Sequence, residues 1–182
     1  MNETDVLIDI SQKLNSINIP YMLTGSLAMN YYAEPRMTRD IDLVIMIKKG
    51  MEKKLINKFK EDYYISKNAI EQAIRNNSMF NIIHNETVVK ADFIIRKETR
   101  YRKEEFKRRK NIEIDGEEIS IVSREDLIIS KLEWAKGSNS EMQKKDILNL
   151  LNGEYNKNYL KRWLQSLELY EYFKEFIGEG YL

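Results

Sequence analysis

The segment from Asp40 to Ile47 constrains the fold more than any other part of the sequence, because its side chains alternate as they do in a β-strand. Side chains two residues apart on a strand share a face, so Asp40 and Asp42 point the same way. The opposite face can be buried, because it carries Ile41, Leu43, Ile45 and Ile47. We therefore expect a strand that packs on a core and holds two carboxylates on a supported element rather than on a loose loop.

Other strand patterns occur on both sides of this segment. Short apolar and β-branched runs predict strands over 21–24, 78–84 and 87–96, the last two separated by the polar turn Asn85-Glu86. A hairpin is expected over 111–122, because Asp115-Gly116 is a favoured two-residue turn. These strands require a sheet that brings together distant parts of the chain.

Helical spacing of apolar residues lies between the strands and after them. It predicts helices over 5–17, 27–33, 49–60 and 68–76. From Ser123, which has Asp126 three residues on as in a helix-capping arrangement, the pattern stays helical and includes a tail over 156–177. The patterns therefore predict an α/β (α+β) fold, with an α/β core over 1–122 and a helical region over 123–182 that packs on it.

Composition excludes several kinds of site. The chain has 182 residues, no cysteine and a single histidine, His84, so disulfides, thiolate zinc sites and cysteine nucleophiles are absent. A Ser-His-Asp hydrolase would have to use His84, which ends an apolar run and has no nucleophile-elbow glycines nearby. The formal net charge is only +1, so any basic surface that binds a polyanion must be local.

The N-terminal residues and the apolar runs bear on location. Acids at Glu3 and Asp5 stand where a secretory signal needs cations, and the longest apolar run, from Leu43 to Ile47, is far too short to span a membrane. We expect a soluble cytoplasmic protein without a membrane partner.

Three carboxylates are candidates for a metal site. Hard divalent cations prefer oxygen ligands, and Asp40 and Asp42 converge on one side of their strand. A site for two metal ions needs a further acid, and Asp92, inside the apolar strand over 88–95, is the best candidate. The alternative is that two acids at the start of a strand are only solvated.

Gly25 and Ser26 follow the strand over 21–24 and precede a helix. Glycine lets the chain turn tightly, and a serine next to the free amides of a helix N-terminus can bind a phosphate. The alternative is an ordinary helix start.

The combination of these motifs resembles a known family. The stretch from Leu23 to Leu43 contains Gly25-Ser26 and then Arg-x-Thr-x-Asp-Ile-Asp-Leu from Arg36, with thirteen residues between Ser26 and Asp40. This resembles the signature of the DNA polymerase β-like nucleotidyltransferases. The spacing is similar to that of the AbiE-type toxins and related uncharacterised nucleotidyltransferases, and lincosamide- and aminoglycoside-modifying enzymes have a similar layout.

A second block supports the resemblance. Ser123-Arg124-Glu125-Asp126, Lys131-Leu132 and Lys145-Asp146 resemble the C-terminal motifs of the AbiE-type group, in which a helix lysine and a later Lys-Asp pair support the nucleotide site. Lys131 and Asp146 each interrupt an apolar helix face, so the alternative is an ion pair between packed helices. The sequence departs from many relatives at Asn149, which is an amide where they carry an acid, and a metal role for that position is therefore doubtful.

The resemblance implies a mixed sheet and a metal-dependent transfer reaction. An enzyme of this kind moves a nucleoside monophosphate from a nucleoside triphosphate, ATP among the candidates, to an acceptor hydroxyl and releases pyrophosphate. Asp40, Asp42 and Asp92 are expected to hold two Mg²⁺ ions, with Mn²⁺ as a substitute, and Asp92 to accept the proton. Gly25, Ser26 and Lys131 are expected to bind the triphosphate, with Asp146 orienting Lys131 and with Arg36 and Arg39 neutralising charge.

The acceptor is left open by the sequence. Residues 90–110 carry ten basic and four acidic side chains, with Tyr101 and Phe106 interleaved, which suggests RNA, most plausibly tRNA, as acceptor. A solvated charged helix is the alternative. The AbiE-like motifs add the hypothesis of a toxin with an antitoxin partner. The other functions left open are modification of a small molecule, such as an antibiotic, or of a protein hydroxyl, and a nucleotide- or RNA-binding module that has lost catalysis.

Overall fold

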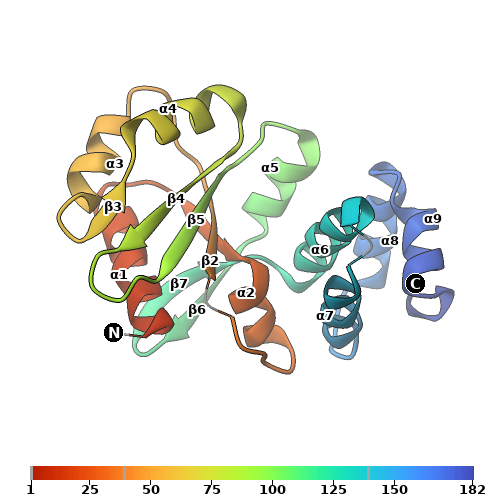
Figure 1. The fold of residues 1–182 in the computed structure, drawn as a ribbon. Coiled ribbons are helices and arrows are strands. Elements are labelled where there is room, and N and C mark those ends of the chain that lie inside the picture. The colour runs from red at the N-terminus through yellow and green to blue at the C-terminus, as the bar shows by residue number, and fades with distance from the viewer. Residues whose placement is uncertain (1, 39, 139) are drawn as a thin grey trace.

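A computed structural model describes residues 2–38, 40–138 and 140–182, and its centre is a mixed sheet of seven strands (Figure 1). The strands are ordered β3-β4-β5-β2-β1-β7-β6. Their bounds are β1 Tyr21–Thr24, β2 Asp40–Ile45, β3 Tyr63–Ile65, β4 Met79–His84, β5 Lys90–Ile95, β6 Lys110–Ile114 and β7 Glu117–Ile121. The expected mixed sheet is confirmed, since β2 pairs with β1 antiparallel and with β5 parallel.

The register of the three central strands places the candidate acids together. Asp42 is paired with Asp92 across β2 and β5, and with Thr24 across β2 and β1. Alternate residues of β2 are buried, as its sequence pattern predicts, so Ile41, Leu43 and Ile45 lie in the core. The core therefore fixes the strand that carries Asp40 and Asp42.

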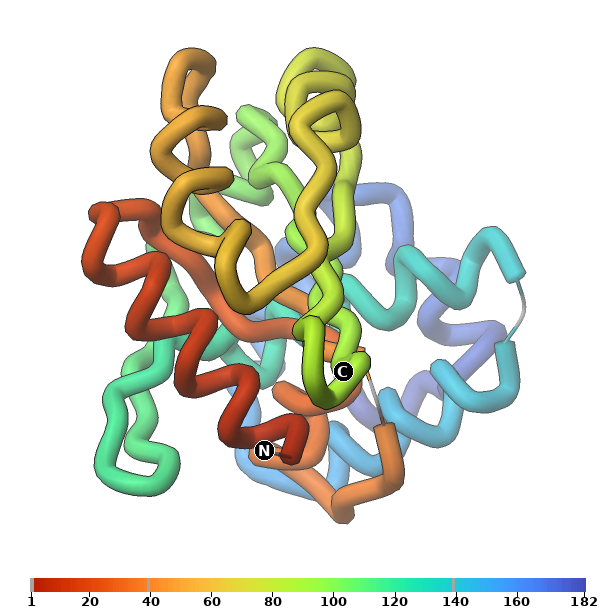
Figure 2. The backbone as a smooth tube through the Cα atoms, turned by 60° about the vertical axis from the view of Figure 1, so that its left-hand side comes forward, coloured from red at the N-terminus to blue at the C-terminus, as the bar shows by residue number. Residues whose placement is uncertain are grey.

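Helices flank the sheet in two groups. Helices α1 (Glu3–Ser16), α3 (Glu52–Phe59) and α4 (Lys67–Asn76) cover one side, where Figure 2 shows the red helix α1 running across the strands. Helix α2 (Gly25–Tyr32) packs on β1 and β2 from the other side. The C-terminal helices α6 (Arg124–Ser138), α7 (Glu141–Leu151), α8 (Lys157–Ser166) and α9 (Tyr170–Phe176) gather beyond α2 (Figure 1), and a short 3₁₀ helix, Glu179–Tyr181, follows them.

Several elements differ from the sequence expectation. Strand β3 was not expected, because three residues are too few for alternation to be visible. The tail over 156–177 forms two helices rather than one, since Glu168 adopts a left-handed conformation with φ of 57° between α8 and α9. Helix α2 begins at Gly25 rather than Leu27. Helix α5 (Arg100–Lys107) is formed by the basic segment after β5 and lies between the sheet and the C-terminal helices (Figure 1).

The expected hairpin over 111–122 is present as β6 and β7. Asp115 and Gly116 both have positive φ, 49° and 82°, as a two-residue hairpin turn requires. Ser123 accepts a hydrogen bond from the amide of Asp126, which confirms the expected cap of α6. Within the described residues, no helix is long and apolar enough to cross a membrane.

Candidate active site

Asp40, Asp42 and Asp92 lie at the same end of two neighbouring strands. Asp40 is largely exposed, Asp42 is half-buried and Asp92 is buried, with 7% of its surface accessible. Because Asp42 and Asp92 are directly paired across parallel strands, their side chains point to the same face. The structure thus brings together Asp42 and Asp92, two of the three acids that the sequence analysis named as metal ligands.

Gly25 is required where it is because Asp42 approaches its backbone closely. Its φ is +65°, in the left-handed region, and a Cβ atom at this position would collide with the carboxylate of Asp42. No residue other than glycine fits without displacing that carboxylate. Gly25 therefore shapes the site as well as the turn from β1 into α2.

The acids are crowded against one another. Burial, together with the charges of Asp92 and Asp40, raises the pKa of Asp42 to about 6. Oδ1 of Asp92 is buried without a hydrogen-bond partner among the described residues. Such a site favours a cation, and one is already present: Nζ of Lys90 lies 2.9 Å from Oδ2 of Asp92 and 3.9 Å from Oδ1 of Asp40.

Lys90 is a site residue that the sequence interpretation missed. It lies two residues before Asp92, so the period of two on a strand was a signal that could have found it. Within the described part of the chain, no three acidic or histidine side chains already converge as a preformed metal cage. The aspartates instead form a negatively charged rim in which a lysine is the counter-ion.

A cationic cluster lies next to the acids, at the start of α2. Nη2 of Arg36 donates to Oγ of Ser26 at 2.7 Å, so the serine hydroxyl proton is directed elsewhere. The same guanidinium makes two hydrogen bonds to Asp146, each 3.0 Å long. Thr24 caps α2 without a side-chain hydrogen bond, which leaves first-turn amides for an anion.

Lys131 and Asp146 form the ion pair that was one of the two expectations. Nζ of Lys131 lies 2.7 Å from Oδ2 of Asp146, and both side chains are buried. Although burial raises it, hydrogen bonds from Arg36 and Lys131 hold the pKa of Asp146 below its ordinary value. One carboxylate thus serves two cations, which leaves the cluster of Arg36, Lys131 and Asp146 with one net positive charge. Asn149 is one turn after Asp146 on α7, and its side chain donates to the backbone oxygen of Glu34.

A cleft of about 260 Å³ lies between Asp42 and Asp92 on one side and Lys131 of the cationic cluster on the other. Its lining includes Gly25 and Ser26 from α2, Asp42 and Asp92 from the sheet, and Lys131 from α6. Gln143, whose side chain accepts a 3.4 Å hydrogen bond from Lys131, and the exposed Trp134 also line it and were not expected. Trp134 lies three residues after Lys131, so it falls on the same face of the helix.

Comparison with known proteins assigns this arrangement to a family. The model of the aminoglycoside-2''-adenylyltransferase family matches residues 6–150, which include every site residue named above. The chain belongs to this family. It is therefore a nucleotidyltransferase. No curated protein matches the sequence.

Solved structures of nucleotidyltransferases share the fold at low sequence identity. ANT(2'')-Ia in complex with adenylyl-2''-tobramycin superposes with a TM-score of 0.60 and 13% identity over 91% of this chain and 98% of the other. An antigenic nucleotidyltransferase-like protein from Paracoccidioides brasiliensis gives 0.58 and 19% over 95% and 90%. The lincosamide antibiotic adenylyltransferase LnuA, bound to lincomycin, gives 0.55 and 14% over 82% and 96%.

Nucleotidyltransferases of this kind use divalent metal ions, and the crowded carboxylates of this chain are suited to them. The cleft of this nucleotidyltransferase thus contains two carboxylates, a glycine-serine helix start and a buried lysine. Arg39, which was also expected near the nucleotide, lies outside the described residues.

Several cations of the basic run from Arg96 to Lys110 contact other groups of the protein. Arg108, for example, contacts Glu125 at 2.9 Å and Asp126 at 3.2 Å, and its guanidinium lies 3.6 Å from the centroid of the Tyr159 ring. Five of the nine cations in the run have ion pairs or backbone contacts inside the protein: Arg96, Arg102, Lys103, Arg108 and Arg109. The run therefore presents fewer free cations than its sequence suggests.

Proposed function

We propose that this nucleotidyltransferase transfers a nucleoside monophosphate from a nucleoside triphosphate to a hydroxyl group of a small molecule. The observation that carries the proposal is the meeting of Asp42 and Asp92 with Gly25, Ser26 and Lys131 in one cleft. In the reaction, the acceptor oxygen bonds to the α-phosphorus and the bond from that phosphorus to the oxygen bridging to the β-phosphorus breaks. Pyrophosphate leaves, and the carboxylate of Asp92 accepts the hydroxyl proton.

Asp40, Asp42 and Asp92 would hold two Mg²⁺ ions, and Mn²⁺ suits the same oxygen ligands. Two observations fit such ligands: Oδ1 of Asp92 is unpartnered among the described residues, and burial with neighbouring acids raises the pKa of Asp42. Bound there, the metal would neutralise the triphosphate and lower the pKa of the attacking hydroxyl. Without a metal ion, the ion pair with Lys90 holds Asp92 in place.

The cationic cluster would bind the triphosphate. Amides at the start of α2 and the hydroxyl of Ser26 are hydrogen-bond donors, and Lys131 supplies a point charge in the cleft. Asp146 is a positioning residue, because it fixes Arg36 and Lys131 at once. The nucleotide would then be held between the cluster and the acidic rim, with ATP as the first candidate given the adenylyltransferase family.

An RNA acceptor, and with it the AbiE-like hypothesis of a toxin with an antitoxin, has weaker support. Its main argument was the basic run, in which four of the nine cations form ion pairs within the protein and a fifth contacts a backbone oxygen. Two solved structures that share the fold, by contrast, hold lincomycin and adenylyl-2''-tobramycin. These observations favour a small-molecule acceptor, and they leave the intact aspartates as the argument against a module that has lost catalysis.

The proposal is tested by incubating the protein with each α-labelled nucleoside triphosphate, Mg²⁺ and separate pools of small molecules, total RNA and cell protein. We expect label from one triphosphate in the small-molecule pool, and none with an Asp42→Asn and Asp92→Asn double variant. Label in RNA or protein instead would overturn the small-molecule acceptor. Absence of label from every pool would overturn the transfer activity.

A further inference from the structure

A second cavity of about 810 Å³ opens next to the candidate active site, within the size range of small-molecule sites. The two spaces are adjacent, because four residues line both: Thr24, Ile94, Ser130 and Trp134. The cavity lies where the end of β5 and the start of α5 face α6 and α8. A molecule bound in it could present a hydroxyl to the aspartate rim.

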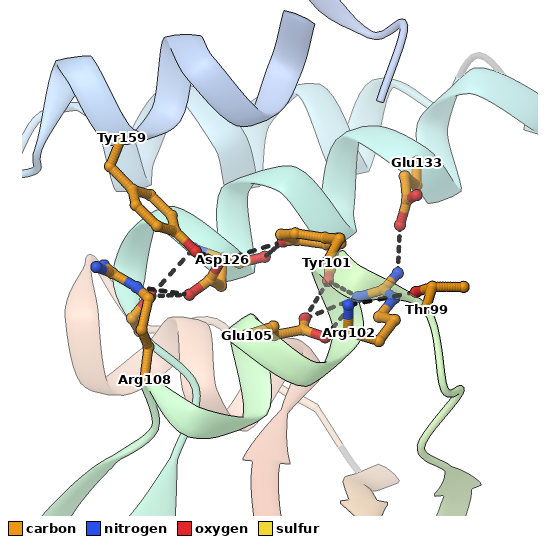
Figure 3. A network of polar contacts seen from close by, with 10 residues as sticks. Thr99, Tyr101, Arg102, Glu105, Arg108, Asp126, Glu133 and Tyr159 are labelled. Carbon is orange, nitrogen blue, oxygen red and sulfur yellow. Dashed lines mark hydrogen bonds and ion pairs between the residues drawn. The ribbon is translucent and has the colours of Figure 1, made fainter. Parts of the chain in front are cut away.

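The two acids of this cavity are already occupied. Figure 3 shows Arg102 between Glu105 and Glu133, and Nη1 of Arg102 lies 2.7 Å from Oε1 of Glu105. Glu105 also accepts a 2.9 Å hydrogen bond from Ser130 and is buried. An amine on a ligand would therefore find both carboxylates already paired with an arginine of the protein itself, with one net negative charge left among the three groups.

The remaining cations of the cavity are less satisfied. Lys97 and Arg100 are exposed and form no ion pair with another described residue. The Arg96 side chain is about nine-tenths buried and pairs with Glu98 through Nη2, while its Nε has no hydrogen-bond partner within the described part of the chain. With Arg102, four cations and two acids line the cavity, a net charge of +2, and Glu98, which pairs with Arg96 beside the lining residues, lowers the local charge to +1.

Two tryptophan side chains also line the cavity. Trp134 is 63% exposed at the junction of the two spaces, and Trp163 lies deeper, with the guanidinium of Arg100 5.8 Å from its ring centroid. An exposed indole next to free cations suits a ligand that has a planar or apolar ring beside a negative charge.

We infer that this cavity holds the acceptor and selects a hydroxyl compound carrying an anionic group next to a planar or apolar ring. The inference rests on the proposed function, which supplies the premise that the molecule in this cavity receives the nucleoside monophosphate. It sets this chain apart from a relative that binds a polyamine antibiotic, because a polycation would meet net positive charge. The anion lies against Lys97 and Arg100, and the ring lies against Trp134.

Tryptophan fluorescence gives a direct readout, because the chain has two tryptophans and both line this cavity. The probes are three glycosides with the same aromatic ring and sugar frame: para-nitrophenyl β-glucuronide, which is anionic, the glucoside, which is neutral, and the glucosaminide, which is cationic. Binding is measured by calorimetry and by quenching, without nucleotide or metal. It is therefore independent of the transfer reaction.

We expect the glucuronide to bind at least about tenfold more tightly than the glucosaminide, with the glucoside between them. A Lys97→Gln and Arg100→Gln double variant should remove that preference. A Lys53→Gln and Lys107→Gln variant removes the same charge at exposed positions outside the cavity and should keep it. Glucosaminide binding as tight as glucuronide binding, no glucuronide binding at millimolar concentration, or a preference that survives in Lys97→Gln/Arg100→Gln would overturn the inference.

A second arm adds ATP and Mg²⁺ and seeks the nucleotidyl adduct by mass spectrometry. We expect an adduct on the glucuronide that disappears in the Asp42→Asn variant. An adduct on the glucosaminide alone would overturn the inference and leave the proposed reaction standing. Preferential glucuronide binding with no adduct on any probe would overturn the proposed reaction, while the anion preference measured without nucleotide would stand.

Discussion

Asp42 is the residue at which function and stability oppose each other. Its pKa is raised from 3.8 to about 6 by burial and by Asp92 and Asp40, so the ionised carboxylate destabilises the metal-free fold. This cost is fully present above the folded-state pKa and disappears below 3.8, where the group is protonated in both states. A cation bound at the site would therefore stabilise the ionised carboxylate of Asp42, which is unfavourable in the metal-free protein.

We expect Asp42→Asn to abolish transfer and to raise the free energy of unfolding at pH 8 in the absence of metal by up to about 3 kcal/mol, at about 1.4 kcal/mol per pKa unit. The gain should shrink as pH falls through 6 and vanish below 4. Urea titrations of both proteins across this range measure it. A loss of stability at pH 8 would identify Asp42 as a structural partner instead.

Gly25 offers a matched pair of variants. In Gly25→Ala the new methyl group and Oδ2 of Asp42 cannot both keep their places, whereas Gly116, with φ of +82°, has open space around it. Both changes should cost about 1 kcal/mol of stability from backbone strain. Only Gly25→Ala should also reduce turnover, by at least about a hundredfold. Comparable turnover of the two variants would show that Asp42 tolerates displacement.

Lys131 and Asp146 can be separated because Asp146 has a second cation. In Lys131→Met, Asp146 keeps both hydrogen bonds to Arg36, so the fold should lose little, while turnover falls by about ten- to a thousandfold. In Asp146→Asn, two cations lose their carboxylate and the free energy of unfolding should fall by about 3 kcal/mol or more. Thermal melts and steady-state kinetics distinguish them. A large drop in melting temperature with normal turnover in Lys131→Met would make the lysine purely structural.

At the scale of elements, helix α5 is fastened to the C-terminal helices by buried charges. Arg102 binds Glu105 within α5 and reaches Ser130 and Glu133 on α6, while Tyr101 and Tyr159 both donate to Asp126 (Figure 3). Because these groups are buried, removing one partner leaves the other uncompensated. The network therefore fixes the wall of the cavity that we assign to the acceptor.

We expect Arg102→Met to lower the free energy of unfolding by about 3 kcal/mol, since it leaves Glu105 buried without its cation. Adding Glu105→Gln should recover part of the loss, because the amide carries no charge. Lys103→Met, an exposed neighbour on the same helix, is the control and should change stability by less than about 1 kcal/mol. No recovery in the double variant would mean that Arg102 acts through packing rather than charge.

Elements with clear periodicity were predictable, and those fixed by tertiary contacts were not. The alternation in β2 and the Asp-Gly turn gave their elements almost to the residue. Strand β3 is formed by pairing with β4, and the break at Glu168 depends on local backbone conformation, so neither has a periodic signal. The basic run was expected as a surface, but two of its arginines, Arg102 and Arg108, pair with acids on α6, which are distant in the sequence.

At the scale of the whole molecule, some residues of the candidate site were predictable from the sequence and others were not. Asp42, Asp92, Gly25, Ser26 and Lys131 were expected from motifs, and one cleft brings them together. The hydrogen bonds from Arg36 to Asp146 join residues 110 positions apart, and no local pattern encodes such a contact. The acceptor cavity is likewise formed by three distant segments around β5, α6 and α8, so its charge could be assessed only in the folded chain.

The central claim is that the aspartate rim binds divalent metal together with the nucleotide. Titration with Mn²⁺ in the presence of a non-hydrolysable ATP analogue, followed by electron paramagnetic resonance, tests it most directly. We expect tight Mn²⁺ binding by wild type, loss of at least about tenfold in affinity in Asp42→Asn and in Asp92→Asn, and no change in Asp115→Asn. The last variant removes a carboxylate from the distant β6–β7 turn, where asparagine tolerates the same positive φ. Equal Mn²⁺ affinity in wild type and Asp42→Asn would contradict the assignment.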